Sequence, residues 1–85
     1  MTWRVIIPTD FQQRIWDLPP GPRSALHDFV AERLRIDPHA ATSPYGQDPG
    51  GPVQVRTAAV GPLITAWIVS AKSGDITLVE LVHAG

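Results

Sequence analysis

Residues 53–82, VQVRTAAVGPLITAWIVSAKSGDITLVELV, decide the fold of this chain. Turn residues divide the segment twice, at Gly61-Pro62 and at Lys72-Ser73-Gly74-Asp75, and they predict an antiparallel meander. The expected strands run over about 53–60, 63–71 and 76–83. A strand with one face in water alternates apolar and polar residues, whereas this segment carries apolar residues at both odd and even positions. It therefore predicts a sheet that is covered on both sides.

The alternation assigns side chains to faces. In the second strand we expect Leu63, Trp67 and Val69 to point one way, opposite to Ile64, Ala66 and Ile68. In the third strand we expect Ile76, Leu78 and Val82 to oppose Val79 and Leu81. The chain has one other apolar block large enough to cover a face, and it lies before residue 37. The second face therefore needs a partner or another copy of the chain, which favours a binding protein.

The residues before position 37 predict one strand and two helices. Trp3–Ile7 indicates a first strand that Pro8 stops, and Thr9 with Gln12 has the form of a helix-capping box. Phe11, Ile15 and Leu18 follow at helical spacing. The run at 19–22 (Pro-Pro-Gly-Pro) ends this helix, and we expect Pro22 to be the first residue of the next one. That helix carries Leu26, Phe29, Val30 and Leu34 and ends at Asp37-Pro38.

The element order is β-α-α-β-β-β, which predicts a single α+β domain over residues 1–85. We expect an antiparallel four-stranded sheet with a helical hairpin on one face. Residues 39–52 are rich in Pro and Gly and predict a loop of about fourteen residues. Trp16 lies one position off the apolar stripe of the first helix, and it is the tryptophan that we expect a partner to contact.

Composition excludes several classes of protein. The formal charge of −1 argues against a protein that grips nucleic acid by neutralising several phosphates. There is no cysteine, hence no disulfide or thiolate metal site, and the three histidines lack metal-ligand spacing, so we expect no metal or other cofactor. No apolar run approaches the ~20 residues that span a bilayer. With no signal-peptide pattern in Met1–Arg4, we expect a cytoplasmic protein without membrane contact.

The order of these elements, together with residues at matching places, resembles the RelE/ParE superfamily of bacterial type II toxins. The resemblance covers almost the whole chain and depends on spacing rather than on one motif. Its features are the strand at 3–7, Phe11, Leu18-Pro19, the helix positions Leu26, Phe29, Arg33-Leu34 and Asp37-Pro38, then Val55-Arg56, Trp67 and Val82-His83. It implies a RelE-like fold and a toxin that a cognate antitoxin protein neutralises.

The resemblance implies two different activities. Members of the RelE branch cut messenger RNA on the ribosome and so inhibit translation, and in that case Arg56 and His83 are the candidate catalytic residues. Histidine suits proton transfer near neutral pH, and the arginine fork suits a phosphate. We expect both on the sheet face away from the helices. Candidate RNA- or partner-binding residues are Tyr45, Arg33, Arg35 and Lys72.

Members of the ParE branch inhibit DNA gyrase without that catalytic set. The same fold can therefore serve as a non-catalytic binding protein, either a gyrase inhibitor or a degenerate toxin that acts through complex formation. The charge balance and the two-faced sheet favour this second interpretation, and a homodimer through the sheet or the helices is a further alternative. An unrelated partner-binding α+β family with the same element order is the third, because fold alone does not fix function.

Overall fold

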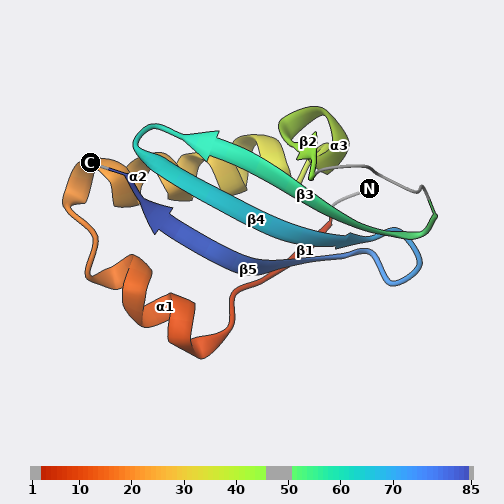
Figure 1. Ribbon diagram of the computed structural model, residues 1–85, viewed down its shortest axis with the longest axis horizontal. Coiled ribbons are helices and arrows are strands. Elements are labelled where there is room, and N and C mark those ends of the chain that lie inside the picture. The colour runs from red at the N-terminus through yellow and green to blue at the C-terminus, as the bar shows by residue number, and fades with distance from the viewer. Residues whose placement is uncertain (1–2, 46–50, 85) are drawn as a thin grey trace.

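The computed structural model describes residues 3–45 and 51–84. Their elements, in chain order, are β1 (Arg4–Ile6), α1 (Thr9–Trp16), α2 (Pro20–Phe29), the π-helix η1 (Val30–Leu34), α3 (Pro38–Ala41), β2 (Ser43–Pro44), β3 (Val53–Val60), β4 (Leu63–Ser70) and β5 (Asp75–His83). The strands form one sheet in the order β1-β5-β4-β3-β2 (Figure 1). The expected α+β class and the three closing strands are confirmed.

The sheet differs from the expected four antiparallel strands in two respects. First, β1 pairs with β5 in parallel, with Val5 opposite Ile76. Parallel pairing needs a long crossover connection, and here almost the whole chain between the two strands supplies it. Second, the segment predicted to be loop contains α3 and the short strand β2, which pairs with β3 through Ser43 and Thr57. Part of that predicted loop, residues 46–50, lies outside the described residues.

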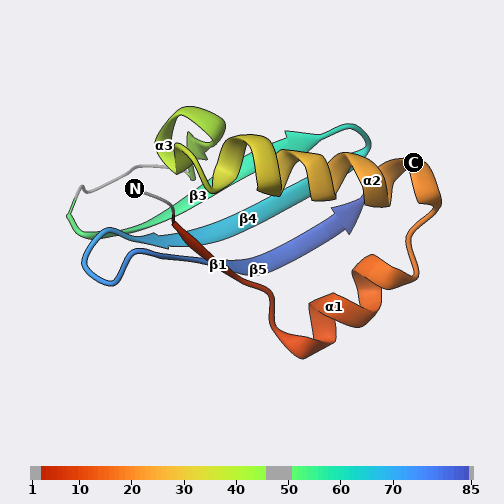
Figure 2. The ribbon, with the colours of Figure 1, turned by 180° about the vertical axis from the view of Figure 1, so that it is seen from behind.

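The helix formed by α2 and η1 covers one face of the sheet. Figure 2 shows α2 in front of the strands, whereas Figure 1 looks onto the face that no described helix covers. The core lies between them. It contains Leu26, Phe29 and Leu34 from the helices and Leu63, Trp67 and Val69 from β4, all at most 6% exposed. The alternation expected for β4 is therefore confirmed.

A β-bulge in β5 changes the alternation that the sequence predicted for this strand. Leu78 pairs with Trp67 while Glu80 pairs with Ala66, so Val79 is the extra residue. As a result Leu78 and Leu81 are both buried, although they are three residues apart. The sequence-based assignment, which put Val82 rather than Leu81 on the face of Leu78, is wrong for this reason.

The helix starts also differ from expectation. Helix α1 begins at Thr9 itself, directly after Pro8, so the capping box does not form and no side chain caps this terminus. Instead Gln12 Nε2 donates a hydrogen bond to the Ile7 carbonyl at 2.8 Å. Helix α2 begins at Pro20, two residues before the expected start, since a proline in the first turn has no amide hydrogen to satisfy.

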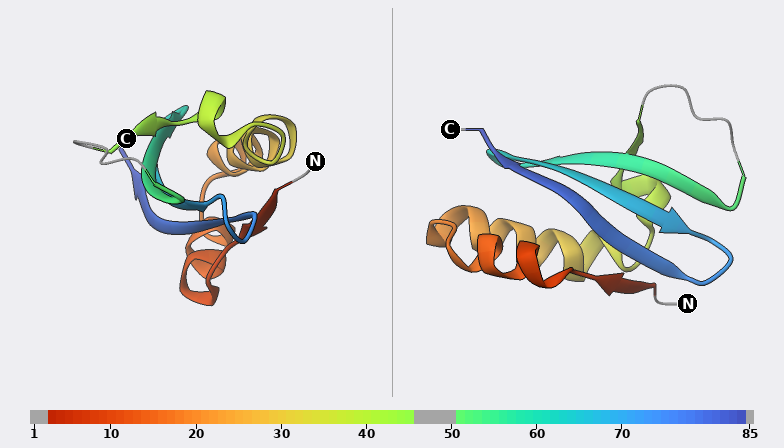
Figure 3. Two further views of the ribbon diagram at one scale, coloured as in Figure 1. Left: turned by 90° about the vertical axis from the view of Figure 1, so that its right-hand side faces the viewer. Right: turned by 60° about the horizontal axis from the view of Figure 1, so that its bottom comes forward.

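Helix α1 lies beside the outer edge of β5 (Figure 3). The pairing with β1 uses only the first three residues of β5, which leaves the later part of that edge without a strand neighbour. The Arg14 guanidinium donates a hydrogen bond to the Leu81 carbonyl at this edge. Among the described residues, no helix combines the length and the apolar character needed to cross a membrane.

Candidate partner-binding faces

The sheet face away from α2, called the open face below, is apolar. It is made of Ile6 of β1, Val53, Val55, Thr57 and Ala59 of β3, Ile64, Ala66, Ile68 and Ser70 of β4, and Thr77, Val79, Glu80 and Val82 of β5. Of the nine large apolar side chains that are exposed in the described residues, six lie here, including Val53 at 55% and Ile64 at 51%. The expectation that the sheet carries more apolar surface than its own helices cover is confirmed.

The open face carries little charge. At its corner the Arg4 guanidinium pairs with the Asp75 carboxylate, with Nη2 and Oδ1 2.7 Å apart and Nε donating to the same oxygen at 2.8 Å. The hydrogen bond from Arg4 lowers the pKa of Asp75, and the same bond raises the pKa of Arg4. Glu80, beside the bulge, has no ion-pair partner among the described residues. The face therefore offers apolar contact and one carboxylate.

A second candidate surface is a groove of about 570 Å³ between α1 and the helix formed by α2 and η1. The corner at Pro19 separates the two helices, and η1 continues α2 with a wider turn in which the Arg35 amide donates to the Val30 carbonyl at 3.1 Å. The groove is lined mainly by apolar side chains, which are Ile7, Ile15, Trp16, Pro20, Leu26, Val30 and Ala31. Its polar lining residues are Arg23, Ser24, His27 and Arg35.

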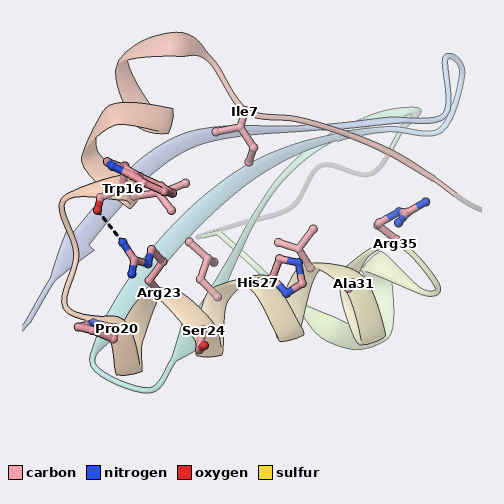
Figure 4. A pocket seen from close by; sticks show the side chains of 11 residues that line it. Ile7, Trp16, Pro20, Arg23, Ser24, His27, Ala31 and Arg35 are labelled. Carbon is pink, nitrogen blue, oxygen red and sulfur yellow. Dashed lines mark hydrogen bonds between the residues drawn. The ribbon is translucent and has the colours of Figure 1, made fainter.

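One end of the groove is formed by an arginine packed on a tryptophan (Figure 4). The Arg23 guanidinium carbon lies 5.1 Å from the centre of the Trp16 ring, and Nη1 donates to the Trp16 carbonyl at 3.0 Å. Trp16 is nevertheless 71% exposed, as the sequence predicted. Tryptophan and arginine are both enriched at protein–protein interfaces, so this end of the groove is a candidate contact surface for a protein partner.

Arg56, a candidate catalytic residue, is only 8% exposed and holds the chain around α3. Its Nε donates to Thr42 Oγ1 at 2.7 Å, and its Nη2 donates to the Thr42 carbonyl at 3.1 Å and the His39 carbonyl at 3.3 Å. Its Nη1 donates to Gln54 Oε1 at 2.9 Å. All three guanidinium nitrogens are thus engaged in contacts within the chain.

His83, the other candidate catalytic residue, is the last residue of β5 and lies at one end of the sheet. It pairs with Leu63, whereas Arg56 pairs with Trp67, four positions further along β4. These two rows are about 13 Å apart along the strand, and β3 and β5 lie on opposite sides of β4. Since Leu63 and Trp67 point into the core, both candidates also lie on the helix-covered side of the sheet. Their expected placement on the far face is wrong, and the structure does not bring them together.

The four candidate RNA- or partner-binding residues lie away from His83. Tyr45 follows β2, with its amide bonded to the Val55 carbonyl at 3.1 Å and its side chain 61% exposed. Lys72 lies exposed in the turn between β4 and β5. Arg33 packs over the Phe29 ring at 5.6 Å, and Arg35 lines the groove. Figure 1 shows the β4–β5 turn and the C-terminal end of β5 at opposite ends of the molecule.

Sequence reasoning missed Arg23, Ser24 and Ala31 as part of a surface. A signal was present for Ser24 and Ala31, because they follow one another with His27 at helical spacing along a single stripe of the continuous helix formed by α2 and η1. Glu80 was missed as the carboxylate of the open face for a different reason. The bulge that turns Glu80 and Val79 to the same side leaves no signal in the sequence.

No protein-family model matches this chain, and no curated protein matches it in sequence. Among solved structures it is similar to the toxin–antitoxin complex RelBE2 from Mycobacterium tuberculosis, with a TM-score of 0.80 and 17% identity over 98% of this chain and 99% of that chain. It is also similar to the archaeal RelE–RelB complex from Pyrococcus horikoshii OT3, with a TM-score of 0.83 and 21% identity over 100% and 98%. The chain thus shares over its whole length the fold seen in these RelE–RelB complexes, as its resemblance to the superfamily predicted.

Proposed function

We propose that this chain is the toxin component of a type II toxin–antitoxin pair, and that it acts by binding a protein target rather than by cutting RNA. The likeness to two structures described as toxin–antitoxin complexes supports the class. The open face is the observation that carries the mode of action, because it presents exposed Val53 and Ile64 with no described helix over them. An apolar patch of this kind marks a protein-interaction site.

The charges of the open face support a protein ligand. Binding to RNA depends on lysine and arginine side chains that neutralise phosphates. Arg4, at the corner of the face, is already paired with Asp75, and Glu80 would repel a phosphate. We therefore assign the face to an antitoxin or to the toxin's target, for which the ParE-like alternative names DNA gyrase.

In the ribonuclease alternative, His83 is the one candidate catalytic residue whose side chain remains available. The Arg56 guanidinium is engaged by Thr42, Gln54 and His39. In that alternative His83 would transfer the proton of the attacking ribose hydroxyl. The RNA on the ribosome would then be contacted by Tyr45, Arg33, Arg35 and Lys72. We favour binding because Arg56, the cation that this alternative pairs with His83, is buried and already engaged within the chain.

The test is bacterial growth with the chain expressed alone and together with the protein encoded by the adjoining gene. We expect expression alone to slow growth and co-expression to restore it. Ile64→Asp places a charge on the open face, in the central strand β4 between Ala59 and Val82, and should abolish the toxicity. Ile36→Asp is the matched control, because Ile36 is a similarly exposed isoleucine outside that face and should leave toxicity intact.

The catalytic alternative makes the opposite prediction for His83→Ala. Under the binding proposal this variant remains toxic, and messenger RNA from the expressing cells stays intact. Loss of toxicity in His83→Ala, together with cuts in translated messages that disappear in the variant, would overturn the proposed mode of action. Absence of toxicity combined with no complex with the neighbouring protein would overturn the assignment to a toxin–antitoxin pair.

A further inference from the structure

We propose that the groove between α1 and α2 binds an amphipathic helix of a partner protein, with acidic residues at both ends of that helix. The groove and the open face lie on different sides of the sheet, so this site is separate from the one on which the proposed function depends. The inference holds whether or not the chain is a toxin.

The length of the groove fits a short helix. Arg23 lies at one end and Arg35 at the other, with His27 and Ala31 between them (Figure 4). The two arginines are twelve positions apart along the α2–η1 helix, which corresponds to about 18 Å. A bound helix of about three turns would therefore place its first and last turns beside the two arginines.

The floor of the groove fits the apolar stripe of such a helix. Ile7, Ile15, Leu26 and Val30 supply apolar surface, so side chains spaced three and four residues apart on the partner would be removed from water. The stripe of the α2–η1 helix that lines the groove carries the small residues Ser24 and Ala31. Small side chains let a second helix approach closely, as ridges-into-grooves packing requires.

The charges that line the groove favour a partner helix with acidic residues at its two ends. Arg23 and Arg35 line it, no aspartate or glutamate does, and neither arginine has a salt bridge among the described residues. Asp28, a carboxylate on the same helix, faces the His27 ring, with Nδ1 and Oδ1 3.5 Å apart. Carboxylates of a bound helix would meet both guanidinium groups, which fixes its register and speeds association.

RNA is also anionic, but it fits this site less well. A sugar–phosphate backbone would leave the apolar floor uncovered. Trp16 stacked with Arg23 could hold a base, yet Ile7, Ile15 and Val30 offer no polar group to read or orient it. We therefore commit to a helical peptide and treat RNA as an outcome of the test.

The probe is a synthetic helical peptide of about 14 residues, long enough for three turns, with leucines at every third or fourth position and glutamates at both ends. A second peptide has lysine in place of each glutamate. Each is titrated into the isotopically labelled full chain while the Trp16 indole and Ala31 methyl signals are followed by NMR. We expect the glutamate peptide to shift both signals and to bind on the order of tenfold more tightly than the lysine peptide at low salt.

Charge reversal locates the interaction. The double variant Arg23→Glu/Arg35→Glu should weaken the glutamate peptide on the order of tenfold and should strengthen the lysine peptide. Lys72→Glu changes a charge in a distant turn and should leave both affinities unchanged. If the double variant binds the lysine peptide more tightly than the glutamate peptide, this result also shows that the variant is folded.

Four results would overturn the proposal. The first three are equal binding of the two peptides, shifts confined to the open face around Ile64, and tighter binding of a single-stranded RNA 12-mer at the same signals. The fourth is a dimer of the free chain that the double variant dissociates, because a second copy would then be the occupant. Ile64→Asp should leave peptide binding intact, so failure here is distinguishable from failure of the proposed function.

Discussion

Two hydrogen bonds join Arg56 to Thr42: Nε of the guanidinium donates to Oγ1 of Thr42 at 2.7 Å, and Nη2 donates to the Thr42 carbonyl at 3.1 Å. The same hydroxyl donates to the Pro38 carbonyl at 2.6 Å, at the start of α3. This arrangement ties β3 to the chain around α3 and β2. It explains why a strand residue that the sequence offers as catalytic is buried.

Arg56→Ala should therefore destabilise the fold. Removing the guanidinium leaves buried acceptors without donors, and we expect the free energy of unfolding to fall by about 2–4 kcal/mol. Urea denaturation followed by tryptophan fluorescence measures this. Arg33→Ala, at an exposed arginine, should cost less than about 1 kcal/mol. An Arg56→Ala protein of unchanged stability that has lost activity would instead restore Arg56 as a catalytic candidate.

Thr65 of β4 also makes two buried hydrogen bonds, one to β3 and one within β4, and they give a second stability prediction. The hydroxyl donates to the Ala58 carbonyl and accepts from Trp67 Nε1, both at 2.8 Å, and the residue is fully buried. Thr65→Val keeps the shape but orphans the indole N–H, so we expect a loss of about 2 kcal/mol. Thr57→Val, on the open face, is the matched control and should change stability little. Equal stability of both variants in thermal unfolding would refute this role for Thr65.

Parts of the fold that depend on local pattern were predictable from the sequence. The two turns of the closing meander and the opposite faces of Trp67 and Ile64 follow from glycine, proline and strand alternation. The sequence Asp37-Pro38 was interpreted only as the end of a helix. In the structure it is also the start of α3, where the Asp37 carboxylate accepts a hydrogen bond from the Ala40 amide at 3.2 Å.

The remainder depends on contacts between distant parts of the chain, which local pattern does not encode. The bulge at Val79 arises from how β5 fits against β4, and it decides that Leu81 is buried. Three of the four acceptors of Arg56 lie 14 or 17 positions before it, in a segment whose composition predicts a loop. The groove likewise depends on the angle between two helices, so Arg23 carried no local signal of its role.

The exposed open face predicts that the free protein self-associates, because Val55 and Ile64 would be partly removed from water. Ile64→Asp would bring a charge into that contact and should raise the dissociation constant at least about tenfold. Sedimentation velocity over a range of concentrations measures this, with Ile36→Asp as the control. A wild-type chain that stays monomeric at high concentration and binds no apolar dye would contradict the prediction.

Gly61 predicts a backbone effect in the β3–β4 turn. Its φ is +57°, and an added Cβ would meet nothing within 4 Å, so only the conformation opposes a side chain. Gly61→Ala should cost about 1 kcal/mol. Gly21, in the first turn of α2, also has open space but no positive φ, so Gly21→Ala should be neutral or stabilising. If the two alanines have the same effect on the melting temperature, the argument from φ fails.

The Arg4–Asp75 pair predicts how stability depends on pH. The hydrogen bond from Arg4 lowers the pKa of Asp75 in the folded chain below the ordinary value of 3.8. A lowered carboxyl pKa contributes stability that is fully present above the ordinary value and is lost as the pH falls through the folded value. Arg4, whose pKa is raised, stays charged throughout this range and adds no pH dependence.

Asp75→Asn should therefore unfold at a lower temperature than the wild type at pH 7, and the difference should shrink toward zero as the pH falls below 3.8. High salt should also reduce it, because the Arg4 side chain is 72% exposed. Thermal unfolding at several pH values measures both trends. Glu32→Gln, at an exposed carboxylate of η1 without an ion pair among the described residues, is the control. A constant difference between Asp75→Asn and wild type at every pH would show that the pair does not contribute through its charge.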